Sequence, residues 1–339
     1  MVLMALAAPR GERAFLMKTL HRITPLISVC LLAVAICILY KETRKTTWDA
    51  VMLQIRAIPA RSVWQATGLV VVNYMVLSVF DILAFRYIRH PLPPRRTLLV
   101  GFICHTFGNT IGSTLVTGGS VRLRFYSKWG ISVIDIGKVV LFCGLTFWIG
   151  LSAVGGVSFV VDPIVLPADL PLPLKNVRPV GVILLMILSA YLLLSFFFKK
   201  SLKFRGKELA FPPGPLALLQ TLAGAADLLT ISGILYLLLP VSEAMPGLSY
   251  PVFLGYFMVA FMLGTSSLIP GALVVFDGLM ILFLSRHAEN ARAVLLGALV
   301  VYRVLYYLLP LCVGMITLAS VELHYRLIRK KIVPGSTPL

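Results

Sequence analysis

Long apolar stretches alternate along this chain with short polar and basic segments. About 20 helical residues are needed to cross the hydrocarbon core of a bilayer, and six uninterrupted apolar runs approach or exceed that length. They occupy residues 23–40, 64–88, 136–161, 179–198, 215–239 and 293–318. The pattern therefore predicts six membrane-spanning helices.

Two further apolar stretches, residues 98–133 and 251–284, are each interrupted by helix-breaking positions. The interruptions read almost alike, as STLVTGG at 113–119 and SSLIPGA at 266–272. Broken backbone at membrane depth survives only where it is buried in protein or lines a wet cavity. Broken helices in both halves of a chain are typical of a transporter's binding site. We therefore expect two hairpins of broken helices.

The distribution of Lys and Arg favours one topology. Basic clusters, which prefer the cytoplasmic side, occupy the N-terminal tail and residues 86–96, 122–138, 199–207 and 326–331. All of them reach that side only if each interrupted stretch enters and leaves the membrane on the same side. The sequence thus predicts an all-α polytopic membrane protein with about six full spans and two re-entrant broken-helix hairpins. These eight hydrophobic segments would form an inverted repeat.

The predicted organisation has a membrane repeat in each half. A cytoplasmic N-tail at 1–22 precedes a first repeat at 23–161 with its hairpin at 98–133. A second repeat at 179–318 has its hairpin at 251–284, and a basic cytoplasmic C-tail follows at 319–339. Residues 41–61 carry five basic residues yet fall outside in this scheme. Their apolar positions recur with the helical period, which favours either an amphipathic helix on the outer surface or a solvated linker helix.

Composition supports a membrane protein. Hydrophobic residues make up 59% of the 339 and the mean hydropathy is +0.93, above the roughly half that soluble domains carry. The net charge of +18 predicts adhesion of the cytoplasmic face to anionic lipids and does not argue for nucleic acid. The five cysteines lie in apolar segments without metal-ligand spacing, so packing roles are expected, with neither a metal nor a cofactor.

The first hairpin contains candidate phosphate ligands. Asn109, Gly118 and Gly119 surround the break, and Arg122 and Arg124 follow it directly. Glycines allow a ligand to approach the backbone closely, and guanidinium groups bind phosphate oxygens through paired hydrogen bonds. We expect these residues to bind the phosphate of a lipid head group. The alternative is that both arginines are topology anchors at the cytoplasmic interface.

The second hairpin has an acid in the corresponding place. Asp277 follows the break at Pro270 and Gly271. A carboxylate there would suit a zwitterionic or cationic head group carried on a phosphate. It would equally neutralise a nearby arginine or cap a half-helix.

Other ionisable residues lie deep within predicted spans. Arg303 and Asp227 are about 15 and 18 Å along their helices at roughly 1.5 Å per residue, so we expect both near the midplane, able to pair. Such residues are functional candidates by default, although a purely structural ion pair is the alternative. Asp81, nearer the cytoplasmic end of its span, is expected to pair with Arg122 or Arg124.

Enzymatic motifs are not evident in the sequence. We find no Ser/His/Asp set, phosphate loop, dinucleotide fingerprint or zinc motif, and catalytic residues are not predicted. His105, in the first hairpin, is expected either to form hydrogen bonds within the core or to relay a proton.

Three motifs resemble the lysylphosphatidylglycerol synthetase transmembrane region, the flippase half of the multiple peptide resistance factor and its stand-alone relatives. They are LVTGGSVRLRFY at 115–126 with WGIS at 129–132, IPGALVVFD at 269–277 and YRVLYYLLP at 302–310, and Gln220, Asp227 and LLLP at 237–240 agree. The resemblance covers nearly the whole chain. Ala272 and Val274 stand where the family usually has glycine, and Asp277 stands for glutamate.

The resemblance implies a bacterial inner-membrane lipid flippase or transporter with both termini cytoplasmic. It would move a phosphate-bearing lipid, with or without an aminoacyl group, held by Arg122, Arg124 and Arg303. The acids Asp81, Asp227 and Asp277 would neutralise these arginines or receive a cationic head group. The chain ends about 20 residues after its last predicted span, too few for the aminoacyl-transferase domain of the two-part members. We therefore expect no synthesis of lysylphosphatidylglycerol by this chain alone.

A second functional class remains open. The chain would then be a non-transporting, lipid-binding accessory subunit of a membrane-lipid, hopanoid or polyprenyl-carrier pathway, with a lipid-synthesis enzyme as its partner. Transport requires the midplane charges, whereas an accessory subunit tolerates their neutralisation if folding survives.

Overall fold

The computed structural model describes most of the chain between residues 48 and 332. The described residues are 48–111, 114–164, 176–198, 202–204, 207–209, 211–241, 245, 247–266, 273–285 and 291–332. The first predicted span, residues 23–40, lies outside them, as does the predicted break at Pro270 and Gly271.

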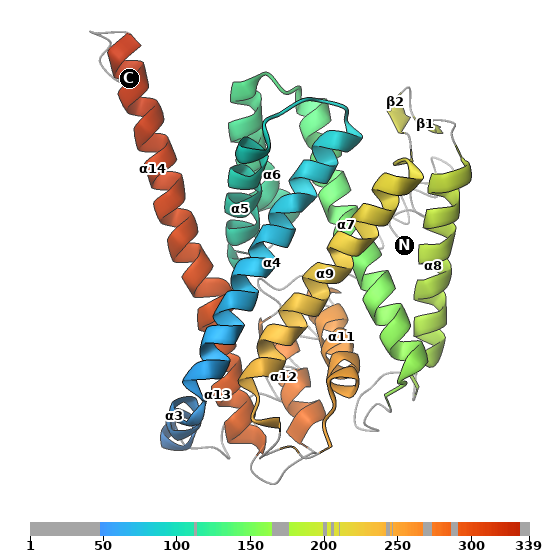
Figure 1. The fold of residues 1–339 in the computed structure, drawn as a ribbon, viewed down its shortest axis with the longest axis vertical. Helices are drawn as coiled ribbons and strands as arrows, with labels where there is room; N and C mark the ends of the chain where they lie inside the picture. Colours follow the sequence, from blue (N-terminus) through green and yellow to red (C-terminus); the bar gives the residue numbers. More distant parts are fainter. Residues whose placement is uncertain are drawn as a thin grey trace, which may run out of the picture.

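The described chain is almost entirely helical (Figure 1). Its first half contains α3 (Trp48–Ala57), α4 (Ala60–Tyr87), α5 (Pro94–Ile111), α6 (Thr114–Tyr126), a 3₁₀ turn (Ser127–Trp129) and α7 (Val133–Val161). Its second half contains α8 (Arg178–Phe197), α9 (Gly214–Leu238), α11 (Tyr250–Ser266), α12 (Leu273–Leu284), α13 (Ala291–Arg303), a π-helical turn (Val304–Leu308) and α14 (Leu309–Ile332).

Five helical segments are long and apolar enough to cross a membrane. They are α4, α7, α8, α9 and the continuous stretch Arg292–Leu323, which joins α13 to α14. These segments confirm five of the six predicted spans. About half of the most apolar window is buried in α4, α7 and α9, against 17% in α8 and in the last segment. The first three therefore form the centre of the bundle, and the other two lie at its edge.

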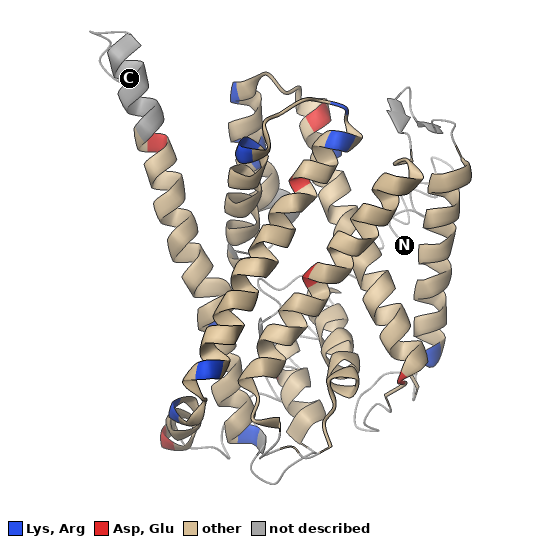
Figure 2. Ribbon diagram, in the orientation of Figure 1, with Lys and Arg blue, Asp and Glu red and all other residues tan. Residues whose placement is uncertain are grey.

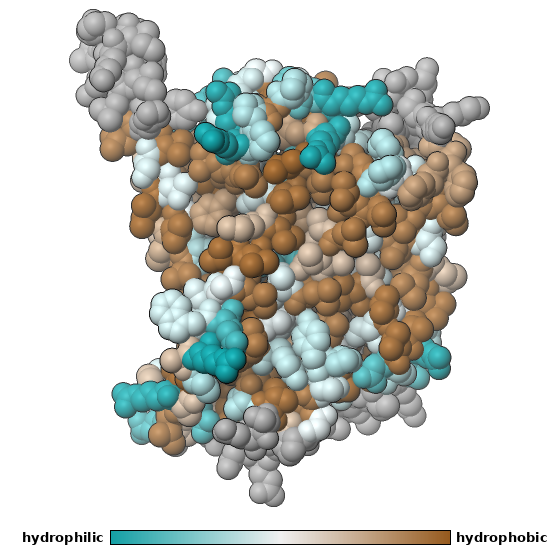
Figure 3. Space-filling view, in the orientation of Figure 1, coloured by the Kyte–Doolittle hydropathy of each residue, from teal (hydrophilic) through white to brown (hydrophobic). Residues whose placement is uncertain are grey.

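The apolar surface agrees with a membrane environment. In Figure 3 apolar side chains cover most of the upper half of the face shown, below a hydrophilic rim. Exposed large apolar residues are especially dense on α8, where Ile183, Met186 and Phe197 are all more than half exposed. Such a surface would be an aggregation liability in water, whereas lipid tails solvate it.

Helices α7 and α9 touch through their backbones. A Cβ atom placed on Gly150 of α7 would lie 2.3 Å from the carbonyl carbon of Gly224 in α9, and one on Gly224 would lie 2.4 Å from the carbonyl oxygen of Thr146. Between helices in lipid, small residues permit the close van der Waals packing that replaces the hydrophobic effect. This glycine crossing therefore sets the distance between the two helices.

A polar contact reinforces that crossing. The side-chain amide of Gln220 donates to Thr146 Oγ1 at 2.9 Å and to the Phe142 carbonyl at 3.3 Å. The hydroxyl of Tyr191, on α8, donates to Gln220 Oε1. Because buried polar groups need partners, these bonds connect α7, α8 and α9 at one level.

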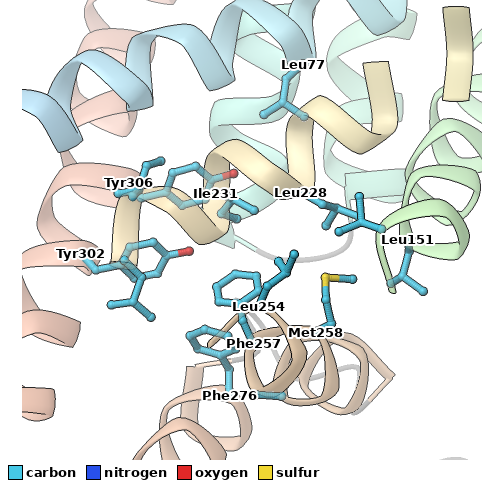
Figure 4. Close-up of a cluster of buried hydrophobic side chains, with 14 of the residues drawn as sticks. Leu77, Leu151, Leu228, Ile231, Leu254, Phe257, Met258, Phe276, Tyr302 and Tyr306 are labelled. Atoms are coloured by element: carbon cyan, nitrogen blue, oxygen red, sulfur yellow. The ribbon is translucent and has the colours of Figure 1, made fainter. Parts of the chain in front are cut away.

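A continuous apolar core extends from α4 to the π-helical turn. Figure 4 shows its centre, and the labelled side chains belong to α4, α7, α9, α11, α12, α13 and the π-helical turn. They are Leu77, Leu151, Leu228, Ile231, Leu254, Phe257, Met258, Phe276, Tyr302 and Tyr306. The core packs the interrupted helices against the long ones.

Each interrupted stretch forms two helices that pack against each other. Helices α5 and α6 are in contact on either side of residues 112–113, and α11 contacts α12. In Figure 1 the α5–α6 pair lies in the upper half of the bundle and the α11–α12 pair in the lower half. The 13 residues of α6 and the 12 of α12 correspond to about 20 and 18 Å. Neither helix alone spans a core of about 30 Å.

Two details depart from the expected all-helical pattern or extend it. Strands β1 (Leu202–Phe204) and β2 (Lys207–Leu209) pair antiparallel, with Leu202 opposite Leu209 and Phe204 opposite Lys207. The sequence of β1 alternates apolar and polar residues with the two-residue period of a strand, whereas β2 does not. In the ambiguous segment 41–61, α3 is helical and packs against α13, with Val51 buried. Its position outside the membrane stays a prediction.

Substitution of the glycine crossing will destabilise the bundle. We expect Gly150→Ala to lower the free energy of unfolding by about 1–3 kcal/mol, because the added methyl group forces α7 and α9 apart. Gly137→Ala, on the same helix, is the matched control because a Cβ there meets nothing within 4 Å. Thermal unfolding of the purified protein in detergent measures both, and equal midpoints for the two variants would contradict the crossing.

Candidate functional site: two ion pairs within the helix bundle

The first ion pair joins α4 to α6. The Nε and Nη2 atoms of Arg122 donate to Asp81 Oδ1 and Oδ2 at 2.9 and 2.6 Å. Both side chains are at most 1% exposed. This two-bond geometry is the strongest that a guanidinium forms with a carboxylate. Of the two partners that the sequence left open for Asp81, the structure brings it together with Arg122.

Three more side chains complete the surroundings of Asp81. The Tyr126 hydroxyl donates to Oδ1 at 2.7 Å, and Cys143 Sγ lies 3.9 Å from Oδ2. His105 Nε2 lies 3.5 Å from Arg122 Nη2 and 4.0 Å from Asp81 Oδ2. Four helices therefore meet at one carboxylate, and its hydrogen-bond donors are all protein side chains. His105 is buried in this network, as one of its two expected roles requires.

Gly101 makes room for this cluster. A Cβ atom at that position would lie 3.1 Å from the Ser78 Cα and 3.2 Å from Asp81 Oδ2. The missing side chain lets α5 approach α4 at the level of the carboxylate. Sequence alone did not single out Gly101, because only the packed structure shows which face of α5 meets α4.

Arg124 is directed elsewhere. Its side chain is 56% exposed, and its Nη2 atom lies 3.0 Å from Glu322 Oε2 of α14. Residues two positions apart on a helix point about 200° apart, so Arg122 and Arg124 cannot serve one site while α6 stays helical. In this structure Arg124 links α6 to α14.

The remaining candidates of the first interrupted stretch lie close to these contacts. The Gly118 carbonyl accepts from Cys104 Sγ at 3.3 Å. A Cβ on Gly119 would lie 3.8 Å from its nearest neighbour, an ordinary contact, so packing does not require glycine there. Asn109 is half-buried, two residues before the end of α5. Phosphate binding by these residues stays a prediction.

The second ion pair joins α12 to α13. Arg303 Nη2 donates to Asp277 Oδ1 at 2.6 Å, and the two side chains are 14% and 20% exposed. The guanidinium carbon also lies 4.8 Å from the centre of the Tyr307 ring, 5.6 Å from Phe276 and 5.8 Å from Tyr302. Aromatic faces attract cations at these distances, so three rings and a carboxylate hold this arginine.

The backbone changes geometry directly after Arg303. Residues Val304–Leu308 form a π-helical turn between α13 and α14. Such turns are uncommon and frequently occur at functional sites, because they reorient side chains and bend the helix. Here the turn carries Tyr307, which packs on the guanidinium of Arg303.

The expected pairing of Arg303 with Asp227 is not formed. Asn73 of α4 instead donates to Asp227 Oδ1 at 2.8 Å and to its backbone carbonyl at 3.0 Å. The depth of each residue along its helix was predicted from residue counts, but depth does not determine direction. Asp227 lies on the face of α9 that meets α4, whereas Arg303 faces α12.

Sequence reasoning missed two polar partners that had detectable signals. Tyr126 is four residues after Arg122, a spacing that places both side chains on one helix face. Asn73 is a polar residue within an otherwise apolar span, where such groups need partners. Tyr307 is likewise four residues after Arg303, whereas Phe276 had no comparable signal because it comes from a different helix.

Related proteins place the chain in a family. It is 35% identical over 317 residues to slr0712, an uncharacterized protein of Synechocystis, covering 93% of this chain and 97% of that one. It is 31% identical over 297 residues to the inner membrane protein YbhN of Escherichia coli, covering 87% and 91%. Phosphatidylglycerol lysyltransferase of Staphylococcus xylosus is 24% identical over 254 residues, which are 72% of this chain and 27% of that enzyme. No family model matches the chain.

The helices and these relatives define a multi-pass inner membrane protein. The chain belongs to the family of YbhN, which is homologous to the membrane part of phosphatidylglycerol lysyltransferase, the lysylphosphatidylglycerol synthetase family. The resemblance found in the sequence motifs is thereby confirmed.

Neutralising both members of the buried pair will cost less stability than the sum of the losses from neutralising each one alone. We expect Asp81→Asn or Arg122→Gln to cost about 3–5 kcal/mol each, since either leaves an unpaired buried charge. The double variant should lose less than the sum of the two. Thermal unfolding in detergent measures the cycle. Arg124→Gln is the control, at no more than about 1 kcal/mol for an exposed pair, and additive losses at Asp81 and Arg122 would contradict the coupling.

Proposed function

We propose that this protein moves a phosphate-bearing lipid between the leaflets of the inner membrane. The observation that supports the proposal most directly is the pair formed by Arg303 and Asp277. It is a charged pair within an apolar bundle, next to an interrupted helix, and both side chains remain partly accessible. Charges inside a membrane protein are expensive and mark ligand pathways by default.

The chemistry of Arg303 suits a phosphate. A phosphodiester presents oxygens spaced much like those of a carboxylate, so it replaces Asp277 as the partner of the guanidinium without rearranging the donors. The surrounding rings of Tyr302, Tyr307 and Phe276 keep the arginine oriented during the exchange. The released Asp277 carboxylate then faces any cationic group on the same lipid head group.

The proposed pathway uses both interrupted helix pairs. In the proposal, α5–α6 and α11–α12 are re-entrant, enter from opposite sides and are related as an inverted repeat, with both chain termini cytoplasmic. Their positions in opposite halves of the bundle in Figure 1 and the short lengths of α6 and α12 support this arrangement. Two opposed re-entrant pairs give a transporter two access states.

In this conformation the arginines of the two ion pairs differ in how easily they could reach a phosphate. Arg122 is buried and satisfied by Asp81, so it reaches a phosphate only in a state that separates α6 from α4. Arg303 needs a much smaller displacement because its pair is already partly exposed. We propose that the described state has the Arg303 side available and the Arg122 side closed.

The relatives suggest the lipids to test first. One is a phosphatidylglycerol lysyltransferase, so phosphatidylglycerol and its lysyl ester are the leading substrates by analogy. A catalytic role for this chain is not proposed. The alternative function is a non-transporting, lipid-binding accessory subunit of a lipid-synthesis enzyme. The complete satisfaction of the Asp81 cluster favours that alternative, because such a network suits a fixed scaffold.

Neutralising Arg303 will slow transport strongly without unfolding the protein. In proteoliposomes, we expect wild type to expose head-group-labelled phosphatidylglycerol or its lysyl ester to an added quencher faster than empty vesicles do. Arg303→Gln should slow this by about tenfold or more, as loss of a charge-assisted pair predicts. Arg178→Gln, an exposed arginine at the start of α8, is the matched control.

Two results separate the alternatives. Wild-type protein that is folded, as judged by helical content and elution volume, yet moves no phospholipid faster than empty vesicles, would favour the accessory subunit. Movement that persists unchanged in Arg303→Gln and Asp277→Asn would exclude this pair from the pathway.

A further inference from the structure

A basic groove lies at the end of α4, separate from both ion pairs. Its volume is about 360 Å³, within the usual range of small-molecule sites of roughly 300–1,000 Å³. Its apolar lining includes Ile82, Phe85 and Leu92, and its polar lining includes Arg86, Arg89 and His90. The groove therefore combines apolar lining residues with three nitrogen-bearing side chains.

The backbone holds Arg89 in an unusual conformation. Helix α4 ends in a motif in which Arg89 N donates to the Arg86 carbonyl and His90 N donates to the Phe85 carbonyl, both at 3.2 Å. The residue after the cap is left-handed in this motif and is usually glycine. Arg89 occupies it with φ of 54° and is the one positive-φ residue other than glycine among the described positions. An arginine at a position that suits glycine indicates a use for its side chain.

The positive charge of the groove is not neutralised from within. None of the described residues that line it is acidic. The acid on the neighbouring helix, Asp135, is engaged by Lys138 Nζ and by the Ser132 hydroxyl, each at 2.8 Å. The groove thus remains cationic, next to a carboxylate that already has its partners.

The position of the groove matches the edge of a membrane. Helix α4 leaves its apolar span at this end, and the described Lys and Arg residues of α5, α6 and α7 gather nearby at the upper end of the bundle (Figure 2). A phosphate at the boundary between hydrocarbon and water would contact the arginines, while an attached apolar chain would contact the apolar lining residues.

We propose that this groove is a phosphate-binding site, in which Arg86, Arg89 and His90 hold the oxygens of a lipid phosphate or of a free phosphate. Arginines bind phosphate through two parallel hydrogen bonds, and basic pockets between helices at a membrane surface bind anionic head groups. The site is independent of Arg303 and stands whether or not the protein transports lipid.

The test uses Arg89→Gly in the purified full-length protein in detergent. Glycine suits the left-handed position, so this variant removes the guanidinium without lowering the thermal unfolding midpoint. We expect phosphatidic acid, measured by native mass spectrometry, to bind at least about tenfold more weakly to Arg89→Gly than to wild type, as loss of a charge-assisted pair predicts. Uncharged diacylglycerol should bind weakly to both proteins.

Controls distinguish the groove from general surface charge and from the transport site. Arg95→Gln removes a neighbouring exposed charge that does not line the groove, and it should bind phosphatidic acid like wild type. Arg303→Gln removes the other proposed phosphate contact, and adding Arg89→Gly to that variant should weaken binding by the same factor as in wild type. Competition by inorganic phosphate would identify a free-phosphate site, and its absence a lipid site. Equal binding by wild type and Arg89→Gly, or equal losses in Arg89→Gly and Arg95→Gln, would overturn the proposal, as would an effect of Arg89→Gly that disappears in the Arg303→Gln background.

Discussion

The carboxylate of Asp81 is the point at which the first half of the bundle is held together. It accepts from Arg122 and Tyr126 of α6, with His105 of α5 and Cys143 of α7 beside it. In an apolar environment each of these polar groups needs a partner. Removing one of them therefore leaves the others buried without a hydrogen-bond partner. The contact fixes the interrupted α5–α6 pair against two long helices, and the arrangement of this half follows from it.

The second half uses the same pair of residue types in a different setting. Arg303 and Asp277 are partly exposed, and aromatic rings replace the tyrosine hydroxyl and histidine of the first cluster. A buried pair that is completely satisfied favours rigidity, whereas a partly solvated one exchanges partners at lower cost. In the proposed function, the difference in burial therefore keeps the Arg122 pair closed in this state and leaves the Arg303 pair able to contact a ligand.

In the basic groove at the end of α4, arginines that are expected at the end of a membrane span also line a defined groove. Clustered arginines at the end of a span are expected from the charge preference of the cytoplasmic side. The helix-ending motif fixes the backbone at Arg89, which lines one groove together with Arg86 and His90. A patch of charge that merely orients a helix needs no such groove.

The sequence by itself determined the membrane class, the family, five described spans and the division of two further apolar stretches into separate helices. These follow from apolar run length, helix-breaking residues and short motifs, all of which are local. It also identified Asp81, Arg122, Asp277 and Arg303 as candidates. The first predicted interruption, at 113–119, is helical from Thr114 onward, and the second lies outside the described residues. Only the tertiary structure decided that Arg303 meets Asp277 rather than Asp227 and that Arg124 turns toward Glu322. Those choices depend on how each helix is rotated about its axis, which is set by packing between distant segments such as the contact of Gly150 with Gly224.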